Sequence, residues 1–346
     1  MHIINLDANA SLPPTEAARL ALIQSLDLCA NPSSPHQLGR RLRTHLDLAR
    51  SQVAKALGGK DQDVFFTSGA SEGNRWLVDS VLSTGKLSVW STALEHPSLA
   101  KPLRSCSWAP SIEAADVVFA TAAHNETGLI TDWEPILAQI NPDAILVSDV
   151  SQSLGRIGSV PDRVDAMVCS GHKIGAYPGV GAILLRNRAK RLKAPWTGGG
   201  QEGNLRPGTE ASQLIIAFGA AADEIELIRS KNQDLKPLRD RLEGLLLQAW
   251  PMARRIPETG ARLPNTSALA LSRVNGDALR ILVDQTGVCV GFGSACSALA
   301  PEPSPALLSL GLTREEARAT IRLSLCPNTT ELEIREAAKR LIALKI

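Results

Sequence analysis

Short, mostly apolar runs recur along the first half of this chain at the spacing of strand–helix–strand units. They cover residues 64–66, 116–120, 144–148, 166–168 and 180–185. Strands that are apolar throughout are buried on both faces, and connections of crossover length join parallel neighbours. The pattern therefore predicts an α/β fold in which a mostly parallel sheet is flanked by helices.

The length of 346 residues is enough for one large and one smaller domain. A helical pattern over residues 211–250, broken near Lys236 and Pro237, links the two. Beyond it we expect a smaller α+β domain with an apolar run, a helix and a final helix whose capping box begins at Thr330. The predicted divisions are an N-terminal segment that packs with the smaller domain, the large domain and the C-terminal domain, at residues 1–14, 15–250 and 251–346.

Composition excludes several classes of protein. The net charge is +2, and no dense Lys/Arg run with interleaved aromatic residues marks a nucleic-acid surface. No apolar run reaches the ~18 residues of a membrane span, and the first residues lack the pattern of a signal peptide. The six cysteines are scattered without paired or zinc-type spacing, so we expect free thiols, no metal and a cytoplasmic location.

Lys173 is the most informative single residue, because it closely follows the apolar run at 166–168. Burial disfavours the charged form of a lysine and frees its amine as a nucleophile. With Ser170 and His172 beside it, such a lysine suggests a Schiff base to a phosphorylated aldehyde cofactor. The alternative is a surface turn with a solvated lysine.

Two further polar clusters follow predicted strands, where open α/β sheets gather ligands. The small residues at 68–71 lead into a helix and can present backbone N–H groups to a phosphate; alternatively, a serine there simply caps the helix. Asp149, with Gln152 three residues on, can pair with a protonated pyridine nitrogen, although a lone Asp is more often a turn or cap residue.

Less specific signals come from a histidine and a glycine-rich loop. His96 could stack on a cofactor ring or be an ordinary polar residue near a turn. Residues 198–209 contain two glycine clusters, which fit either a phosphate grip or a flexible connection.

Three cysteines and one arginine have surroundings that suggest different roles. Cys296 lies among small residues that predict an exposed loop, whereas Cys169 and Cys289 lie in apolar runs typical of buried, inert thiols. Arg322 alternates with apolar residues on a predicted strand. Its guanidinium could hold an α-carboxylate, or form a surface ion pair at a sheet edge.

Taken together, these motifs resemble the cysteine desulfurases, which are pyridoxal-phosphate enzymes of fold type I in the class V aminotransferase group. The matching segments run in family order over nearly the whole chain: residues 6–10, 31–34, 67–72, 95–96, 125–128, 149–153, 170–173, 206–209, 293–296 and 321–324. The combination of Ser-Gly-His-Lys at 170–173 with Gly-Ser-Ala-Cys at 293–296 is the most specific part.

The resemblance implies a role for each matching residue. Lys173, His96 and Cys296 would be catalytic: Lys173 binds the cofactor and moves protons, His96 stacks on the ring and assists proton transfer, and Cys296 attacks the substrate sulfur. Asn125 and Arg322 would bind the substrate, Arg322 at its carboxylate. The implied residues for pyridoxal 5'-phosphate are Ala70, Ser71, His96, Asn125, Asp149, Gln152, Ser170, His172, Lys173 and Thr209.

The implied reaction converts L-cysteine to L-alanine and leaves a persulfide on Cys296 for a sulfur-acceptor protein that serves iron–sulfur assembly or tRNA thiolation. Thr209 would reach the phosphate in the neighbouring subunit of a homodimer. Two other interpretations stay open: a selenocysteine lyase or aminotransferase of the same fold, and a non-catalytic sulfur-transfer scaffold.

Overall fold

The computed structural model describes residues 2–293, 302–344 and 346. The chain divides into two compact units. The large unit is Leu12–Ala122 with Thr131–Leu227, and the small unit is Met1–Ser11 with Ala123–Ile130 and Ile228–Ile346. The predicted domain divisions after residues 14 and 250 stay a prediction.

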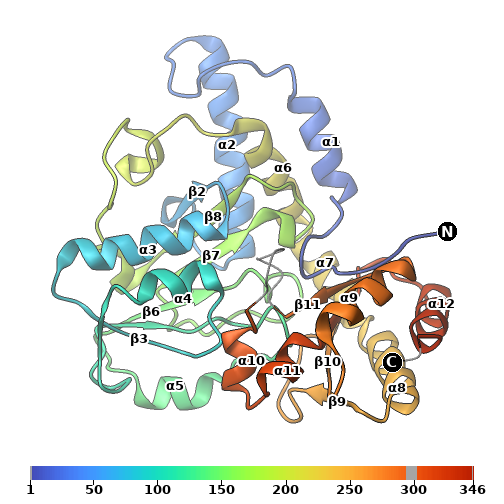
Figure 1. The fold of residues 1–346 in the computed structure, drawn as a ribbon. Helices are drawn as coiled ribbons and strands as arrows, with labels where there is room; N and C mark the ends of the chain where they lie inside the picture. The colour runs from blue at the N-terminus through green and yellow to red at the C-terminus, as the bar shows by residue number, and fades with distance from the viewer. Residues whose placement is uncertain (1, 294–301, 345) are drawn as a thin grey trace. The chain divides into compact units, whose positions relative to one another are not determined.

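The large unit is built on a seven-stranded sheet whose strand order is β2-β8-β7-β6-β5-β3-β4 (Figure 1). Each apolar run predicted as a strand does form one. The strands are β2 Val64–Thr67, β3 Ser88–Ser91, β4 Ser107–Trp108, β5 Val117–Phe119, β6 Ile145–Asp149, β7 Ala166–Ser170 and β8 Gly181–Leu185.

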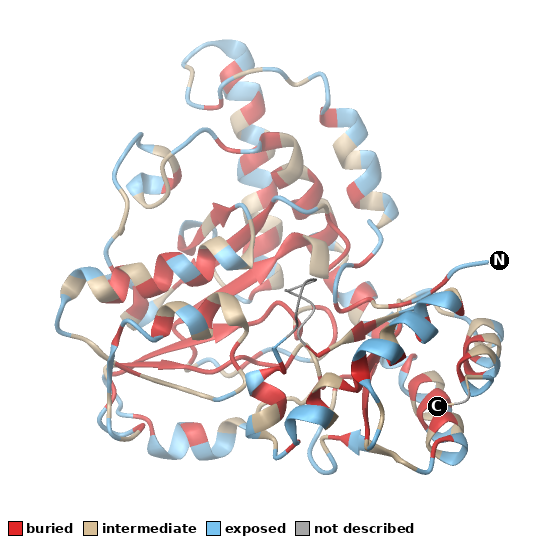
Figure 2. Ribbon diagram, in the orientation of Figure 1, coloured by how far each residue is buried: buried red, intermediate tan, exposed pale blue. Residues whose placement is uncertain are grey.

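The predicted mostly parallel sheet is confirmed, with one exception. Strands β4, β3, β5, β6 and β7 are parallel to one another, whereas β8 runs antiparallel to both β7 and β2. All five residues of β6, β7 and β8 are buried, because helices cover both faces (Figure 2).

Alternation along the strands sends side chains to two hydrophobic cores. Val117 and Phe119 of β5 pack with helices α3 Ala70–Thr84 and α4 Pro97–Leu103. Val118 between them packs on the opposite face with α2 Gln37–Ala56 and α6 Ser212–Asp223. Helices α1 Glu16–Ser25 and α5 Trp133–Gln139 complete this unit.

The small unit is built on a five-stranded sheet in the order β1-β11-β12-β10-β9. Its strands are β1 Ile4–Leu6, β9 Ala253–Ile256, β10 Thr266–Leu271, β11 Val288–Phe292 and β12 Thr320–Ser324, and its helices are α8 Lys236–Ala249, α9 Gly276–Gln285, α10 Pro305–Ser309, α11 Arg314–Arg318 and α12 Glu331–Ile342. The capping box predicted at Thr330 is confirmed: its hydroxyl accepts from the Glu333 N–H, and the Glu333 carboxylate accepts from the Thr330 N–H.

Two expectations were wrong. The helical pattern over residues 211–250 forms three helices, α6, α7 Ile225–Gln233 and α8, and Pro237 lies in the first turn of α8, where a missing N–H costs nothing. Cys289, expected to be buried, is exposed on β11. The expectation failed because an apolar run does not reveal which face of a strand is covered. Within the described part of the chain, no helix has the length and apolar character needed to cross a membrane.

Candidate active site

The large unit gathers its polar residues where its parallel strands end. Asp149 is the last residue of β6, and Ser170 is the last residue of the neighbouring β7. A single 3-10 turn, Gly171–Lys173, follows β7 and carries His172 and Lys173, both half-buried. The strand ends therefore bring a carboxylate and a lysine to one edge of the sheet, where ligands bind in open α/β folds.

The Asp149 carboxylate is buried and held by donors on both oxygens. Its Oδ1 accepts the Ser151 backbone N–H at 2.9 Å, and its Oδ2 accepts the Asn74 amide at 2.9 Å. Each oxygen retains a free lone-pair direction, because an ionised carboxylate has about four acceptor positions. The contact with Ser151, two residues on, is an Asx turn, so Asp149 does have the turn role, and the Asn74 contact from α3 adds a second donor that a turn does not need.

Helix α3 begins without a side-chain cap. Its N-cap is Gly69, so the alternative in which a serine caps this helix is wrong. Gly69 has φ 155°, which residues with a Cβ rarely adopt, and a Cβ at Gly181 of the adjoining β8 would lie 2.7 Å from the Gly69 Cα. The start of α3, with Ala70 and Ser71, is thus packed against the sheet with first-turn N–H groups that suit an anion.

His172 is held neutral. Burial, followed by the charges of Lys173 and Arg156, lowers its pKa to about 4. A neutral imidazole has one N–H donor and one acceptor, so near neutral pH this ring can donate a single hydrogen bond without adding charge.

His96 caps α4 from the residue before it, and its Nδ1 accepts the Ser98 N–H at 3.1 Å. Burial lowers the pKa of His96, the Asp149 charge opposes this, and the Lys173 charge adds to it. Asp149 and Lys173 are therefore both within electrostatic reach of His96.

Glu95, beside His96, is a buried carboxyl group whose pKa is raised. Its Oε1 accepts from the Thr92 hydroxyl at 2.6 Å and the Thr121 N–H at 2.8 Å, whereas Oε2 has no hydrogen-bond partner among the described residues. Burial above all, and then the nearby Asp149 charge, raise the pKa of Glu95 from 4.5 to about 7.

The raised pKa of Glu95 predicts a pH-dependent stability. The folded state holds this proton more tightly than the unfolded chain, so the contribution is complete below pH 4.5 and is lost as the pH rises through about 7. At about 1.4 kcal/mol per pKa unit, the free energy of unfolding should fall by up to about 3 kcal/mol across this window. Urea unfolding at several pH values should show a flatter profile for Glu95→Gln, and equal slopes for the two proteins would contradict the assignment.

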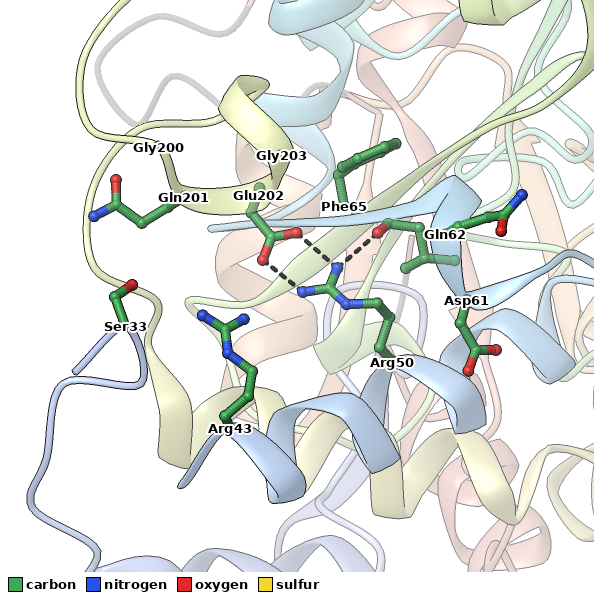
Figure 3. Close-up of a pocket in the computed structure, with 11 residues that line it drawn as sticks. Ser33, Arg43, Arg50, Asp61, Gln62, Phe65, Gly200, Gln201, Glu202 and Gly203 are labelled. Carbon is green, nitrogen blue, oxygen red and sulfur yellow. Dashed lines mark hydrogen bonds and ion pairs between the residues drawn. The ribbon is translucent and has the colours of Figure 1, made fainter. Parts of the chain in front are cut away.

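The glycine-rich loop predicted at 198–209 is pinned to the large unit. Arg206 forms an ion pair with Glu72 in the first turn of α3, at 2.7 Å, and the Trp76 Nε1–H of α3 donates to the Leu205 carbonyl at 2.7 Å. Figure 3 shows a second attachment, in which Arg50 of α2 contacts the buried Glu202 through two hydrogen bonds of 2.7 and 2.8 Å. The alternative of a flexible connection is therefore wrong, and Thr209 lies exposed on an anchored loop.

The pocket drawn in Figure 3 is distinct from the sequence-predicted site. It is lined by Ser33, Arg43, Arg50, Asp61, Gln62, Val64, Phe65, Gly200, Gln201, Glu202 and Gly203. None of these belongs to the predicted catalytic, cofactor-binding or substrate-binding residues, although Gly200 to Gly203 lie in the loop at 198–209 that could have been a phosphate grip. The Arg50–Glu202 pair within the pocket anchors this loop.

The small unit holds Asn125 and Arg322 together. Arg322 lies on β12, the central strand of its sheet, and is buried, so the alternative of an edge-strand arginine is wrong. Its Nη2 pairs with Asp7 at 2.5 Å, and its Nη1 donates to the Asn125 carbonyl at 3.1 Å. Its Nε has no hydrogen-bond partner in the part of the chain that the structure describes.

Of the cysteines singled out in the sequence, Cys296 lies outside the described residues. Cys169 is buried on β7, and burial, together with the Asp149 charge, raises the pKa of its thiol to about 12. The prediction that Cys169 is inert agrees with this environment.

Comparison with known proteins places the chain in one enzyme family. The family model "Aminotransferase class-V" matches residues 4–108 and 109–336. A cysteine desulfurase from Trichormus azollae is 33% identical over 96% of this chain and 90% of its own length. Two solved structures are also similar: a NifS-like protein, with 25% identity, a TM-score of 0.88 and 99% coverage of both chains, and a NifS-like protein from Rickettsia africae, with 27% identity, a TM-score of 0.85 and 98% coverage of both.

The chain therefore belongs to the class V aminotransferases and, within them, to the cysteine desulfurase family. This family depends on pyridoxal phosphate and has the type I fold, as the sequence resemblance implied.

Three residues with specific contacts were missed as site residues: Asn74, Ser98 and Asp7. Asn74 stands one helical turn beyond Ala70, so the helical repeat could have placed both on one face of α3. Ser98 follows His96 by two residues, but its contact depends on the turn that starts α4. The pairing of Asp7 with Arg322 joins residues 315 apart in sequence, and no local pattern signals it.

Proposed function

We propose that this chain converts L-cysteine to L-alanine with pyridoxal phosphate and leaves the sulfur as a persulfide on Cys296. One observation carries the proposal: Asp149 and Lys173 lie at the ends of adjacent parallel strands, with His96 within electrostatic reach of both. That combination meets the needs of a pyridine ring bound through an aldehyde carbon.

The donor set of the large unit fits the phosphate of this cofactor. Helix α3 starts with N–H groups that no side chain in its described surroundings caps, and the place of a Cβ on Gly69 lies 3.6 Å from the Ser170 Oγ. We assign phosphate binding to Ala70, Ser71, Ser170 and the neutral His172, because backbone amides, hydroxyls and a neutral imidazole donate without leaving a charge uncompensated.

The ring would be held by Asp149 at its pyridine nitrogen, by Gln152 at its phenolic oxygen and by His96 stacked on its face. When bound, the cofactor supplies an electron sink for the bonds at the substrate Cα. Asp149 keeps the ring nitrogen protonated, and its two fixed oxygens orient the ring.

Lys173 and Cys296 divide the remaining chemistry. Lys173 would hold the cofactor at its aldehyde carbon and would move the proton at the substrate Cα. The Cys296 thiolate forms an S–S bond with the substrate sulfur, and the Cβ–S bond breaks with its electron pair left on carbon. Protonation of that carbon yields alanine, so the step needs no external oxidant or reductant.

Asn125 and Arg322 would bind the substrate, and Asn125 would also contact the cofactor. Arg322 offers an unused Nε–H beside the two N–H contacts that fix its plane. A planar guanidinium held in this way suits the substrate carboxylate.

Replacing Arg322 by lysine tests this assignment. Lysine keeps the charge but cannot reach Asp7, the Asn125 carbonyl and a carboxylate in one plane. A lost charge-assisted hydrogen bond corresponds to an increase in KM for cysteine of roughly 10- to 100-fold, with a smaller change in kcat. Arg254→Lys, on β9 of the same sheet, is the matched control and should keep the original KM. An unchanged KM in the Arg322 variant would exclude the carboxylate contact.

The partner assignments extend the proposal. Thr209, on its anchored loop, would contact the phosphate bound by a second copy of the chain, so the functional unit would be a homodimer. Its proposed location is the cytoplasm. The persulfide would pass to an acceptor protein of iron–sulfur assembly or tRNA thiolation. Tracing labelled sulfur from cysteine into proteins that co-purify with the enzyme identifies the acceptor.

Alanine formation decides between this function and its alternatives. Purified protein supplied with pyridoxal phosphate and L-cysteine should release alanine in amounts equal to the sulfur transferred. A scaffold without activity would release none, and a transaminase would release a keto acid instead.

A further inference from the structure

A continuous hydrogen-bond chain connects Asp149 to the His96 ring through two residues that have no assigned role. The Asn74 side-chain nitrogen lies 2.9 Å from the Asp149 Oδ2 and 3.0 Å from the Ser98 Oγ. The Ser98 Oγ lies 2.8 Å from the His96 Nδ1, and the Ser98 backbone N–H donates to the same Nδ1 at 3.1 Å. All four residues belong to the large unit.

The direction of this chain follows from its carboxylate end. An ionised carboxylate can only accept, so Asn74 must donate one of its two amide hydrogens to Asp149. The same nitrogen donates the other to the Ser98 Oγ. A flipped amide would place the Asn74 oxygen against the Asp149 carboxylate, which can only accept, and this fixes the orientation of the amide.

Ser98 contacts the His96 Nδ1 through its backbone N–H and its hydroxyl. The Ser98 backbone N–H donates to Nδ1, so this ring atom must carry its lone pair. The Ser98 hydroxyl, which accepts from Asn74, then points its own hydrogen to the same ring atom. The neutral ring then has its proton on Nε2.

We propose that Asn74 and Ser98 are positioning residues that hold His96 as the Nε2–H tautomer, so that His96 acts in the proposed desulfurase reaction as a hydrogen-bond donor and not as a general base. A general base would need a lone pair on Nε2 and a proton on Nδ1, which would lose the contact from the Ser98 backbone N–H and reverse the direction of the contact with the Ser98 hydroxyl. Proton transfer is then left to Lys173. The tautomer of His96 follows from the hydrogen bonds alone. Only the identity of the group that accepts the Nε2–H hydrogen bond rests on the proposed function.

Nitrogen NMR of the full-length protein with isotope-labelled histidine tests the tautomer directly, with and without pyridoxal phosphate. The His96 signals are assigned by their loss in His96→Gln. The expected result is a bare Nδ1 and a protonated Nε2 in both preparations. A protonated Nδ1 in the neutral ring would overturn the proposal.

Two substitutions at position 98 test the positioning role. In Ser98→Ala the fraction of His96 with a proton on Nδ1, measured at one fixed pH, should rise about five-fold, as expected for one lost neutral hydrogen bond. Ser98→Thr keeps the hydroxyl and should match the original protein. The charges that act on His96, Asp149 and Lys173, are unchanged in both variants.

A double substitution separates a chain from two independent contacts. If Asn74 acts through Ser98, then Asn74→Ala combined with Ser98→Ala should give the same Nδ1 protonation as Ser98→Ala alone. Additive effects, or no change in Ser98→Ala, would overturn the proposal. These spectra need no turnover, so a failure here is distinct from a failure of alanine formation, which would reject the proposed function instead.

Discussion

Replacing Cys296 by alanine is expected to lower persulfide and alanine formation from L-cysteine by at least about 10³-fold. The thiolate is the group that accepts the substrate sulfur, and no other step of the proposed reaction breaks the Cβ–S bond. The residues that we assign to the cofactor do not include Cys296, so the visible absorbance of the bound cofactor should persist. Alanine release and absorbance, measured on the same preparation, check both parts.

Cys289→Ala is the matched control for this experiment. Cys289 is an exposed thiol on β11 in the same unit, and its loss should leave the rate unchanged. Full alanine formation in the Cys296 variant would contradict the assignment and favour the selenocysteine lyase interpretation, in which the reaction does not need a protein thiol.

Replacing Lys173 by alanine is expected to remove the covalent link to the cofactor and to lower alanine formation by at least about 10³-fold. The variant loses both the amine that binds the aldehyde carbon and the group that moves the Cα proton. Borohydride treatment followed by peptide mass analysis should attach the cofactor to the peptide containing Lys173 in the original protein and leave it unattached in the variant.

Lys86→Ala provides the control for the lysine experiment. Lys86 is exposed in the turn between α3 and β3, and its removal should change neither the mass of the labelled peptide nor the rate. Attachment of the cofactor at a different lysine in the original protein would show that Lys173 is not the reactive amine.

Much of the large unit follows from local sequence. The runs at 144–147 and 166–168 are apolar throughout because helices cover both faces of β6 and β7, so the sequence predicts their burial. The orientation of β8 was not, since a doubly buried strand has the same composition in either direction. Its direction depends on where the chain re-enters the sheet, which is a property of the whole fold.

The smaller errors have similar causes. Cys289 lies in an apolar run, but one of its faces is left open, and burial of a face is decided by what packs against it. The break between α6 and α7 at Glu224 interrupts a pattern that continues across it, because helical periodicity survives a single non-helical residue.

The candidate site shows the same division. The sequence alone identifies four site residues and the family, because their chemistry is rare at strand ends and in small-residue loops: Lys173, His96, Asp149 and Cys296. The protonation states of the site do not follow from the sequence. That His172 stays neutral, that Glu95 holds a proton near neutral pH and that His96 presents Nε2–H all depend on burial and on neighbours distant in sequence.

The sequence by itself therefore determined the α/β class, the order of the motifs and the residues able to carry the reaction, because apolar periodicity and reactive side chains are local properties. Only the tertiary structure decided which carboxylate oxygen meets which donor, which arginine is central in its sheet and which nitrogen of His96 carries the proton. Hydrogen-bond direction and desolvation arise from groups that folding brings together, and no single segment of the chain contains them.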